Sequence, residues 1–125
     1  MTTRTLDFPN KRELSTSKNI EFSVFIPSTR AFSIKLSSAS FRKRMEVAIR
    51  FFTKMFDGST IVVGEGSYKY EGKTIKEKVG IITVNATRSD YNKYDETIEK
   101  WIRNKKKTWG QDSMGFVYQG KMIFI

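Results

Sequence analysis

The 125 residues of this chain suit one domain, and its 38% hydrophobic and 14% aromatic residues suffice to build one core. The chain has neither cysteine nor histidine, which excludes disulfides, Cys-ligated zinc, iron–sulfur clusters and His-based catalysis. Its 23 Lys and Arg residues against 13 Asp and Glu residues give a net charge of +10, which favours polyanionic partners.

The N-terminal part of the sequence carries no targeting or membrane signal. No apolar run is long enough to cross a membrane, and residues 1–10 lack the basic and then apolar pattern of a secretion signal. We therefore expect a cytoplasmic protein without membrane contact. Residues 1–18 are polar and have neither helical nor strand periodicity, so we expect a flexible N-terminal arm followed by a single α+β domain over 19–125.

A strand and an amphipathic helix come next. Ile20, Phe22 and Val24 alternate with other residues as in a half-buried strand, until Pro27 ends the pattern. A helix over about 40–56 follows a serine cluster that can cap it. Its apolar stripe consists of Phe41, Met45, Ala48, Ile49, Phe52, Met55 and Phe56. Its opposite face is either a solvated surface or a phosphate-binding one, and carries Lys43, Arg50 and Lys54.

A long β-hairpin is predicted over 60–70 and 73–86, turning at Glu71-Gly72. Tyr70 then faces Lys73, and both faces of the hairpin are partly apolar, so that one of them is covered by a partner chain or serves as a binding face. The Gly64-Glu65-Gly66 segment is followed by strand residues, which favours a bulge or bend over a phosphate loop.

Two carboxylates of this hairpin, Glu65 and Glu77, could be imagined as a metal-binding pair. In the predicted register, however, Glu65 faces Lys78, which favours an ordinary cross-strand ion pair. We therefore expect no metal and no cofactor.

The second helix is predicted over about 89–109, with acidic residues in its first half and basic residues at its end. Its buried stripe comprises Tyr91, Tyr94, Ile98, Trp101, Ile102 and Trp109. The run Lys105, Lys106 and Lys107, with Arg103 and beside Trp109, is the best candidate for binding phosphates and stacking on a base. The alternative is a helix end charged for stability, with Trp109 in the core.

The last segment, 116–125, closes the sheet, and Gln119-Gly120 is a candidate turn within it. The order strand, helix, strand, strand, helix, strand predicts a ferredoxin-like βαββαβ sandwich, with a four-stranded antiparallel sheet and both helices on one face. RNA-recognition motifs share this frame, but the third strand, 78–84, lacks their stacking aromatics.

Several short motifs carry a resemblance to a known family. These are Phe52-Thr53-Lys54-Met55-Phe56-Asp57-Gly58-Ser59-Thr60, Gly64-Glu65-Gly66-Ser67-Tyr68 and Gly110-Gln111, with Phe25-Ile26-Pro27-Ser28 and the end of the chain, 120–125. They resemble a family of short uncharacterised α/β proteins of microbes and their mobile elements, with the pattern F-G-G-x-T, G-x-G-x-W, G-Q. Asp57 replaces a glycine and Tyr68 a tryptophan of that pattern. The resemblance supports the fold and implies no catalytic residue.

The sequence leaves three functional hypotheses. The first is a small basic non-enzymatic module that binds nucleic acid, supported by the charge of +10 and the basic helix ends. The second is a module that recognises an acidic protein partner, for example a mobile-element-encoded regulator or defence inhibitor, supported by the two-sided apolar hairpin. The third and least favoured is a carboxylate-dependent enzyme that acts on an anionic substrate. The apolar hairpin and open sheet edges also predict a homodimer.

Overall fold

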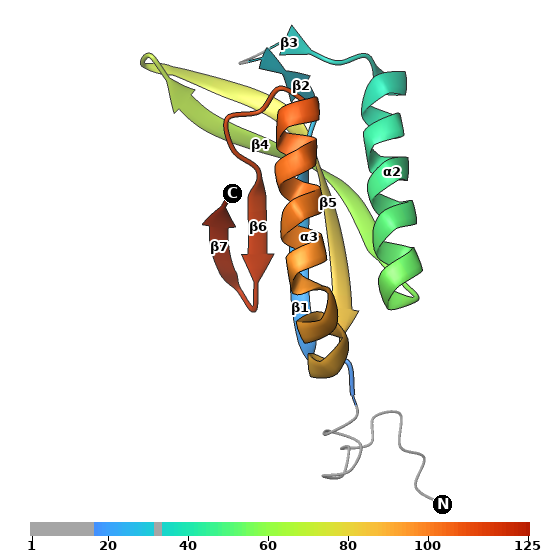
Figure 1. Cartoon of the computed structure of the whole chain (residues 1–125). Coiled ribbons are helices and arrows are strands. Elements are labelled where there is room, and N and C mark those ends of the chain that lie inside the picture. Colours follow the sequence, from blue (N-terminus) through green and yellow to red (C-terminus); the bar gives the residue numbers. More distant parts are fainter. Residues whose placement is uncertain (1–16, 32–33) are drawn as a thin grey trace, which may run out of the picture.

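The computed structural model describes residues 17–31 and 34–125. The main elements follow the predicted βαββαβ order (Figure 1): β1 (Ile20–Pro27), α2 (Ser38–Phe56), β4 (Thr60–Tyr70), β5 (Lys73–Ala86), α3 (Arg88–Thr108) and β6 (Gly115–Tyr118). A short ribbon of β2 (Thr29–Arg30) and β3 (Ile34–Lys35) and a last strand, β7 (Lys121–Phe124), complete the described elements. Most of the predicted arm, 1–18, lies outside the described residues.

The main sheet is antiparallel throughout, with the strand order β4-β5-β1-β6-β7. The predicted α+β class with a large antiparallel sheet is therefore confirmed, but the predicted number of four strands is wrong, because this sheet has five. The reason is the turn at Gln119 and Gly120, whose φ angles of 49° and 81° let the chain fold back tightly. As a result β7 pairs with β6 and becomes the edge strand.

Both helices begin slightly earlier than predicted because polar side chains just before them act as N-caps. The Ser37 hydroxyl accepts a hydrogen bond from the backbone N–H of Ser40 at 3.1 Å, and Thr87 accepts one from Asp90 at 3.1 Å. No helix in the described ranges is long and apolar enough to cross a membrane.

The β4–β5 hairpin has the predicted turn and register. Tyr70 pairs with Lys73, and Glu71 and Gly72 have φ angles of 49° and 77°. The hairpin is longer than its neighbour, because β1 ends where Pro27 pairs with Val79. The part of the hairpin beyond that point, residues 65–78, projects past the end of β1, and we call it the overhang (Figure 1). The overhang leaves one edge of β5 free beside the β2–β3 ribbon.

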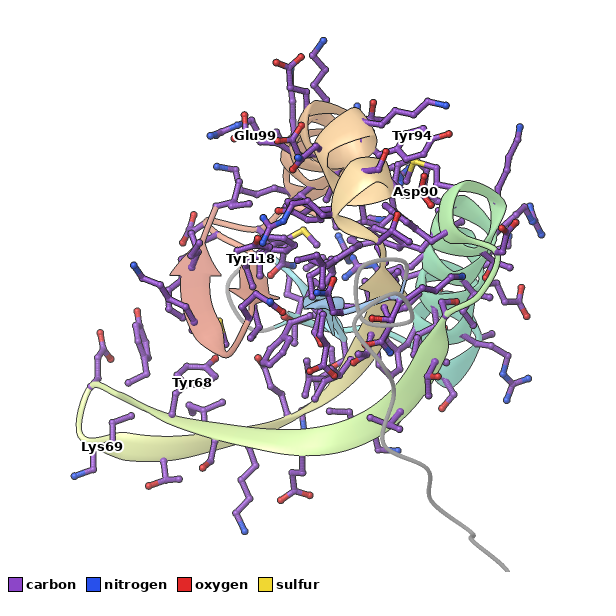
Figure 2. All side chains as sticks on the ribbon, turned by 90° about the horizontal axis from the view of Figure 1, so that it is seen from below. Tyr68, Lys69, Asp90, Tyr94, Glu99 and Tyr118 are labelled. Carbon is purple, nitrogen blue, oxygen red and sulfur yellow. The ribbon has the colours of Figure 1, made fainter. Side chains whose placement is uncertain are left out.

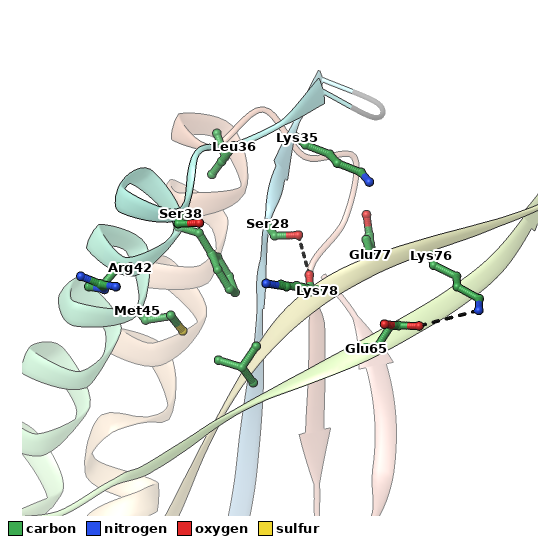
Figure 3. A pocket seen from close by; sticks show the side chains of 12 residues that line it. Ser28, Lys35, Leu36, Ser38, Arg42, Met45, Glu65, Lys76, Glu77 and Lys78 are labelled. Carbon is green, nitrogen blue, oxygen red and sulfur yellow. Dashed lines mark hydrogen bonds and ion pairs between the residues drawn. The ribbon is translucent and has the colours of Figure 1, made fainter.

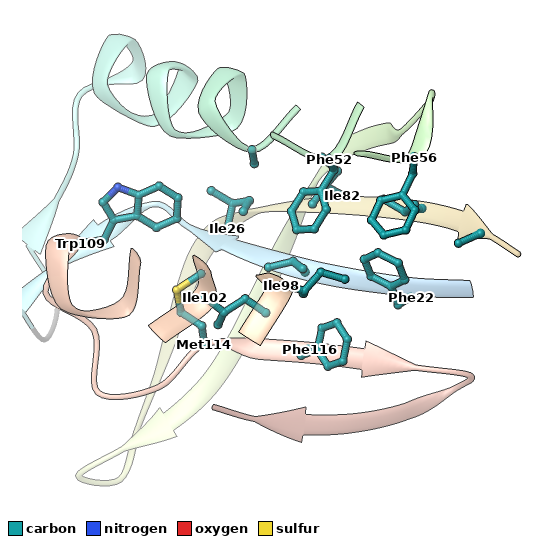
Figure 4. Packing of buried hydrophobic residues seen from close by; sticks show 14 of the residues in the cluster. Phe22, Ile26, Phe52, Phe56, Ile82, Ile98, Ile102, Trp109, Met114 and Phe116 are labelled. Carbon is teal, nitrogen blue, oxygen red and sulfur yellow. The ribbon is translucent and has the colours of Figure 1, made fainter. Parts of the chain in front are cut away.

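The hydrophobic core lies between one face of the sheet and both helices (Figure 4). The Phe22 ring of β1 lies 5.8 Å from Phe52 and 5.4 Å from Phe56 of α2, and 5.5 Å from Tyr91 of α3, measured between ring centroids. Because one side chain of the sheet contacts both helices, α2 and α3 pack on the same face, as predicted. No helix of the described residues covers the opposite face, which we call the open face.

Candidate functional site

The basic residues predicted to bind nucleic acid lie on the two helices. Lys43, Arg50 and Lys54 are exposed on α2. On α3, Arg103 forms an ion pair with Glu99 at 3.5 Å. Lys107 is exposed, whereas Lys105 and Lys106 are half-buried. The predicted nucleic-acid-binding residues are therefore spread over two helices, and one of them, Arg103, is engaged in an ion pair within its own helix.

Trp109 is a core residue. It is 9% exposed, and its ring lies edge-on to Trp101 with 5.9 Å between the ring centroids. The guanidinium carbon of Arg44 lies 5.0 Å from the centroid of the Trp109 ring. The indole is thus enclosed by protein groups and does not provide an exposed surface on which a base could stack.

The two hairpin carboxylates, Glu65 and Glu77, belong to opposite faces of the β4–β5 ladder. Glu65 pairs in register with Lys78, as predicted, while Glu77 pairs with Gly66. The carboxylate of Glu65 lies 4.0 Å from the ammonium of Lys76. Among the described residues no group of three or more His, Cys, Asp or Glu side chains is placed to hold a metal ion.

A cavity of about 570 Å³ lies beside the free edge of β5, between the overhang, the β2–β3 ribbon and the start of α2 (Figure 3). Because it lies at a strand edge, side chains from both faces of the hairpin reach it. We call it the basic cavity, since four of its lining residues are cations. Its lining consists of Ser28, Lys35, Leu36, Ser38, Phe41, Arg42, Met45, Val63, Glu65, Lys76, Glu77 and Lys78.

A second cavity, of about 320 Å³, lies between the open face of the overhang and the loop after α3. We call it the tyrosine cavity. Its lining consists of Thr29, Tyr68, Tyr70, Ile75, Glu77, Gly110, Gln111, Asp112 and Ser113. Among the residues that the structure describes, Glu77 is the one that lines both cavities. Figure 3 shows Glu77 projecting from β5 toward the ribbon that carries Lys35.

The surroundings of Glu77 disfavour its charged form. The side chain is half-buried, and its cross-strand partner Gly66 has no side chain. Burial raises the pKa of the Glu77 carboxyl above its ordinary range. Tyr68 has a raised pKa as well, first because of desolvation and then because of the negative charges of Glu77 and Tyr70. The Tyr68 phenol therefore stays protonated near neutral pH and can donate a hydrogen bond.

Tyr68 lies on the side of the hairpin that lines the tyrosine cavity, whereas its neighbour Lys69 lies on the other side (Figure 2). This follows from the alternation of side chains along a strand. The tyrosine cavity thus presents aromatic rings and one poorly solvated carboxylate to the same space.

The loop after α3 is held in place by two long polar side chains that share an acceptor. Arg44 of α2 donates to the carbonyl oxygens of Pro27 and Thr29, both at 2.8 Å. Gln111 donates to the Thr29 oxygen at 2.5 Å and to the Trp109 oxygen at 3.0 Å. These bonds tie the wall of the tyrosine cavity to the end of β1 and to β2.

Gly110, in the loop that forms the wall of the tyrosine cavity, lies close to the backbone of Ala31. Its φ is +64°, its carbonyl accepts a hydrogen bond from the Ala31 N–H at 3.0 Å, and a Cβ at this position would lie 3.2 Å from the Ala31 nitrogen. A side chain at Gly110 would therefore strain the backbone and push the loop away from the ribbon.

From the sequence, Glu77 was considered only as part of a carboxylate pair and Arg44 was not a candidate, although each carries a signal. Glu77 is the charged member of an otherwise apolar alternation, Ile75, Val79 and Ile81. Arg44 stands three residues after Phe41 and four before Ala48, on the buried stripe of its helix. A charged residue on an apolar face indicates a specific polar environment. In this protein Glu77 lines the two cavities, and Arg44 shares the Thr29 oxygen with Gln111 of the cavity wall.

The fold is shared with solved structures of an enzyme. The chain superposes on phage SAM lyase in complex with S-methyl-5'-thioadenosine with a TM-score of 0.59 and 13% identity, covering 86% of this chain and 89% of that chain. For phage SAM lyase in the apo state the TM-score is 0.54 and the identity 15%, covering 86% and 88%. The sequence matches no family model and no curated protein, so the resemblance to the microbial and mobile-element family stays a prediction.

This comparison contradicts the hypothesis of a non-enzymatic binding module, while the expected partners, nucleic acid or an acidic protein, stay a prediction. Two solved structures that share the fold over 86% of the chain are those of an enzyme. The non-enzymatic module was predicted mainly from the net charge of +10. Net charge describes the long-range electrostatic field of a protein, whereas catalytic activity depends on a few groups in one cavity.

Proposed function

We propose that this protein is a ferredoxin-like α+β enzyme that binds S-adenosylmethionine (SAM) and cleaves the bond between its sulfonium sulfur and its amino-acid tail. One observation carries the proposal: the half-buried residue Glu77 lines both the tyrosine cavity and the basic cavity. The fold shared with phage SAM lyase supports the choice of substrate. The net charge of +10 favoured an anionic substrate for the enzyme hypothesis, which ranked last, whereas this site favours a ligand with a cationic centre.

The arrangement suits the two chemically different parts of SAM. The rings of Tyr68 and Tyr70 offer flat surfaces to the adenosine and attract a neighbouring cation through their π-electrons. Glu77 adds a negative charge at the point where the sulfonium would lie. A carboxylate that burial has left poorly solvated gains more from a cation than an exposed one does.

Cleavage removes charge from the site. The electron pair of the broken carbon–sulfur bond stays on sulfur, which becomes a neutral thioether, S-methyl-5'-thioadenosine. The carbon is taken by an oxygen of the substrate's own carboxylate, which closes a lactone ring. Since a cation and an anion combine to give neutral groups, a poorly hydrated cavity that holds the tail in a reactive conformation accelerates the step. No cofactor takes part in this scheme.

The test is to incubate the purified full-length chain with SAM and to quantify S-methyl-5'-thioadenosine by chromatography. We expect product from the wild type and at least tenfold less from Glu77→Gln, because the charge that binds the sulfonium is gone. Affinity for neutral S-methyl-5'-thioadenosine, measured by calorimetry, should change little in the same variant. The matched control is Glu71→Gln, an exposed carboxylate at the turn of the same hairpin that lines neither cavity, and this variant should keep the wild-type rate.

Two results would overturn the proposal. One is the absence of product above a protein-free blank together with no binding of SAM. The other is equal loss of activity in Glu71→Gln and Glu77→Gln, which would show that only the net charge of the hairpin matters.

A further inference from the structure

The basic cavity collects cations from three separate elements. Lys35 comes from β3, Arg42 from α2 and Lys78 from β5. A fourth cation, Lys76, already has a partner, since its ammonium lies 4.0 Å from the Glu65 carboxylate. Within the described residues, Lys35, Arg42 and Lys78 form no ion pair with a carboxylate. The lining thus has four cations against two carboxylates, Glu65 and Glu77, and its net charge is positive.

The remaining walls of this cavity are apolar. Leu36, Phe41 and Met45 line it, and Phe41 is only 7% exposed. The Ser28 hydroxyl is turned to the strand edge, where it donates to the Lys78 carbonyl at 2.5 Å. A ligand that fits would combine a short aliphatic chain with an anionic end.

Glu77 lines both the basic cavity and the tyrosine cavity, so a ligand that contacts its side chain can extend toward either of them. On the proposed function, the tyrosine cavity takes the adenosine and Glu77 the cationic centre. The part of SAM that remains is an aliphatic chain that ends in a carboxylate. Its length is that of a methionine side chain, which suits a cavity directly beside Glu77.

We propose that Lys35, Arg42 and Lys78 form a subsite that binds the carboxylate of the amino-acid tail of SAM. The proposal rests on the proposed function of the same site. Arg42 presents N–H donors that can pair with the carboxylate oxygen that does not attack the carbon, while Lys35 and Lys78 act as point charges that attract the group. Holding the carboxylate fixes the conformation of the tail and selects against sulfonium compounds that lack this group.

The test compares three ligands by isothermal titration calorimetry on the full-length chain: SAM, decarboxylated SAM, which keeps the sulfonium but lacks the carboxylate, and S-methyl-5'-thioadenosine. We expect the wild type to bind SAM about tenfold to a hundredfold more tightly than decarboxylated SAM, as for loss of a charge-assisted contact. Arg42→Gln should reduce that preference to about threefold or less and leave the affinity for the other two ligands unchanged.

The matched control is Arg50→Gln, an exposed arginine on the same helix that does not line the cavity. It removes the same charge from the molecule and should keep the full preference for SAM. Arg42 is itself exposed, so both variants should melt at the wild-type temperature. Lys78→Gln tests a second member of the subsite, which comes from β5. It should also reduce the preference for SAM over decarboxylated SAM.

The outcomes separate this proposal from the one on which it rests. Equal affinities of the wild type for SAM and decarboxylated SAM, or equal effects of Arg42→Gln and Arg50→Gln, would overturn the subsite and leave the enzyme intact. Failure of all three ligands to bind would overturn the proposed function and the subsite together.

Discussion

At the scale of single residues, the candidate site is marked by charged groups that the fold holds in poorly hydrated positions. Glu77 stands in a strand whose neighbouring positions on the same face are Ile75 and Val79. An isolated carboxylate in such a position destabilises the folded state, because burial disfavours its charged form. Residues of this kind are kept where activity needs them and at the expense of stability.

Glu77→Gln should therefore stabilise the protein at neutral pH. The folded protein holds the Glu77 proton more tightly than the unfolded chain does, because the pKa is raised from an ordinary value of 4.5. The wild type thus loses free energy of unfolding as the pH rises from that value through the raised pKa, and the glutamine variant does not. Urea melts at pH 4 and pH 7.5 measure this effect. The free energy of unfolding of Glu77→Gln relative to that of the wild type should be larger at pH 7.5 than at pH 4.

The control for this effect is Glu65→Gln, which removes an exposed carboxylate from the same hairpin. Its free energy of unfolding should stay within about 0.5 kcal/mol of the wild type at both pH values. A Glu77→Gln variant that is less stable than the wild type at pH 7.5 would show that the carboxylate accepts a stabilising bond in the folded state.

Arg44 is the second charged residue in a buried position, with 8% of its surface exposed. Carbonyl oxygens, including that of Trp109 at 3.4 Å, satisfy its guanidinium. Arg44→Lys keeps the charge but replaces the planar fork by one ammonium, which cannot reach all these oxygens. We expect it to lower the free energy of unfolding by about 1–3 kcal/mol in denaturant melts.

Arg50→Lys is the matched control for Arg44→Lys, because Arg50 is exposed on the same helix. It should change stability by less than about 0.5 kcal/mol. Equal effects of the two substitutions would mean that the hydrogen bonds of Arg44 contribute nothing beyond helix propensity.

At the scale of elements, α2 and α3 are joined by an aromatic contact. The rings of Phe51 and Trp101 stack with 4.9 Å between their centroids, and Phe52 meets Trp101 edge-on at 5.2 Å. Phe52 is fully buried, whereas Trp101 is half-buried. The helical spacing predicted both residues for the core, but only the packed structure shows that they are buried to different extents.

Truncation should reveal this difference. We expect Phe52→Ala to lower the free energy of unfolding by about 3–5 kcal/mol, because it leaves a cavity among fixed neighbours. Trp101→Ala should lower it by less, about 2–3 kcal/mol, since part of the ring is already in water. Chemical denaturation with Lys54→Ala as an exposed control measures both, and a larger loss for Trp101→Ala would contradict the order of burial.

At the scale of the whole molecule, the open face of the sheet carries more exposed apolar surface than a solvated face needs. In the strand register, Val62 of β4 and Phe25 of β1 belong to this face, as do Met122 and Phe124 of β7. Phe124 is 69% exposed and Val62 55% exposed. An apolar surface of this kind, next to the edge strands β4 and β7, is typical of an association surface.

We propose that a second copy of this chain covers the open face. Light scattering at high micromolar concentration should show a species larger than a monomer, and association should strengthen with salt, which screens the repulsion between copies of charge +10. Val62→Glu and Phe124→Glu should each give a monomer, while Lys54→Glu, on the opposite side of the molecule, should not. A monomeric wild type in both low and high salt would exclude this assembly.

Most of the element order could be read from local sequence. The alternation of Ile20, Phe22 and Val24, the serine and threonine caps and the Glu71-Gly72 turn act between residues that are close along the chain, so one sequence suffices to predict them. The register of the hairpin followed from its turn, because a two-residue turn fixes every pair after it. The fifth strand was missed in the fold class because β7 is short and its apolar pattern continues that of β6.

The candidate site was decided by the tertiary structure. Tyr68 and Glu77 lie on the overhang, Gln111 lies after α3, and Arg42 lies at the start of α2, so only the packing of the helices and the ribbon around the free edge of β5 brings them to one place. The amino-acid sequence alone was enough to predict the strands and the helices, and it directly shows the net charge and the lack of cysteine and histidine. Which carboxylate is poorly solvated, and which cations share a cavity with it, depends on long-range contacts, because burial and distance belong to the folded chain and not to any segment of it.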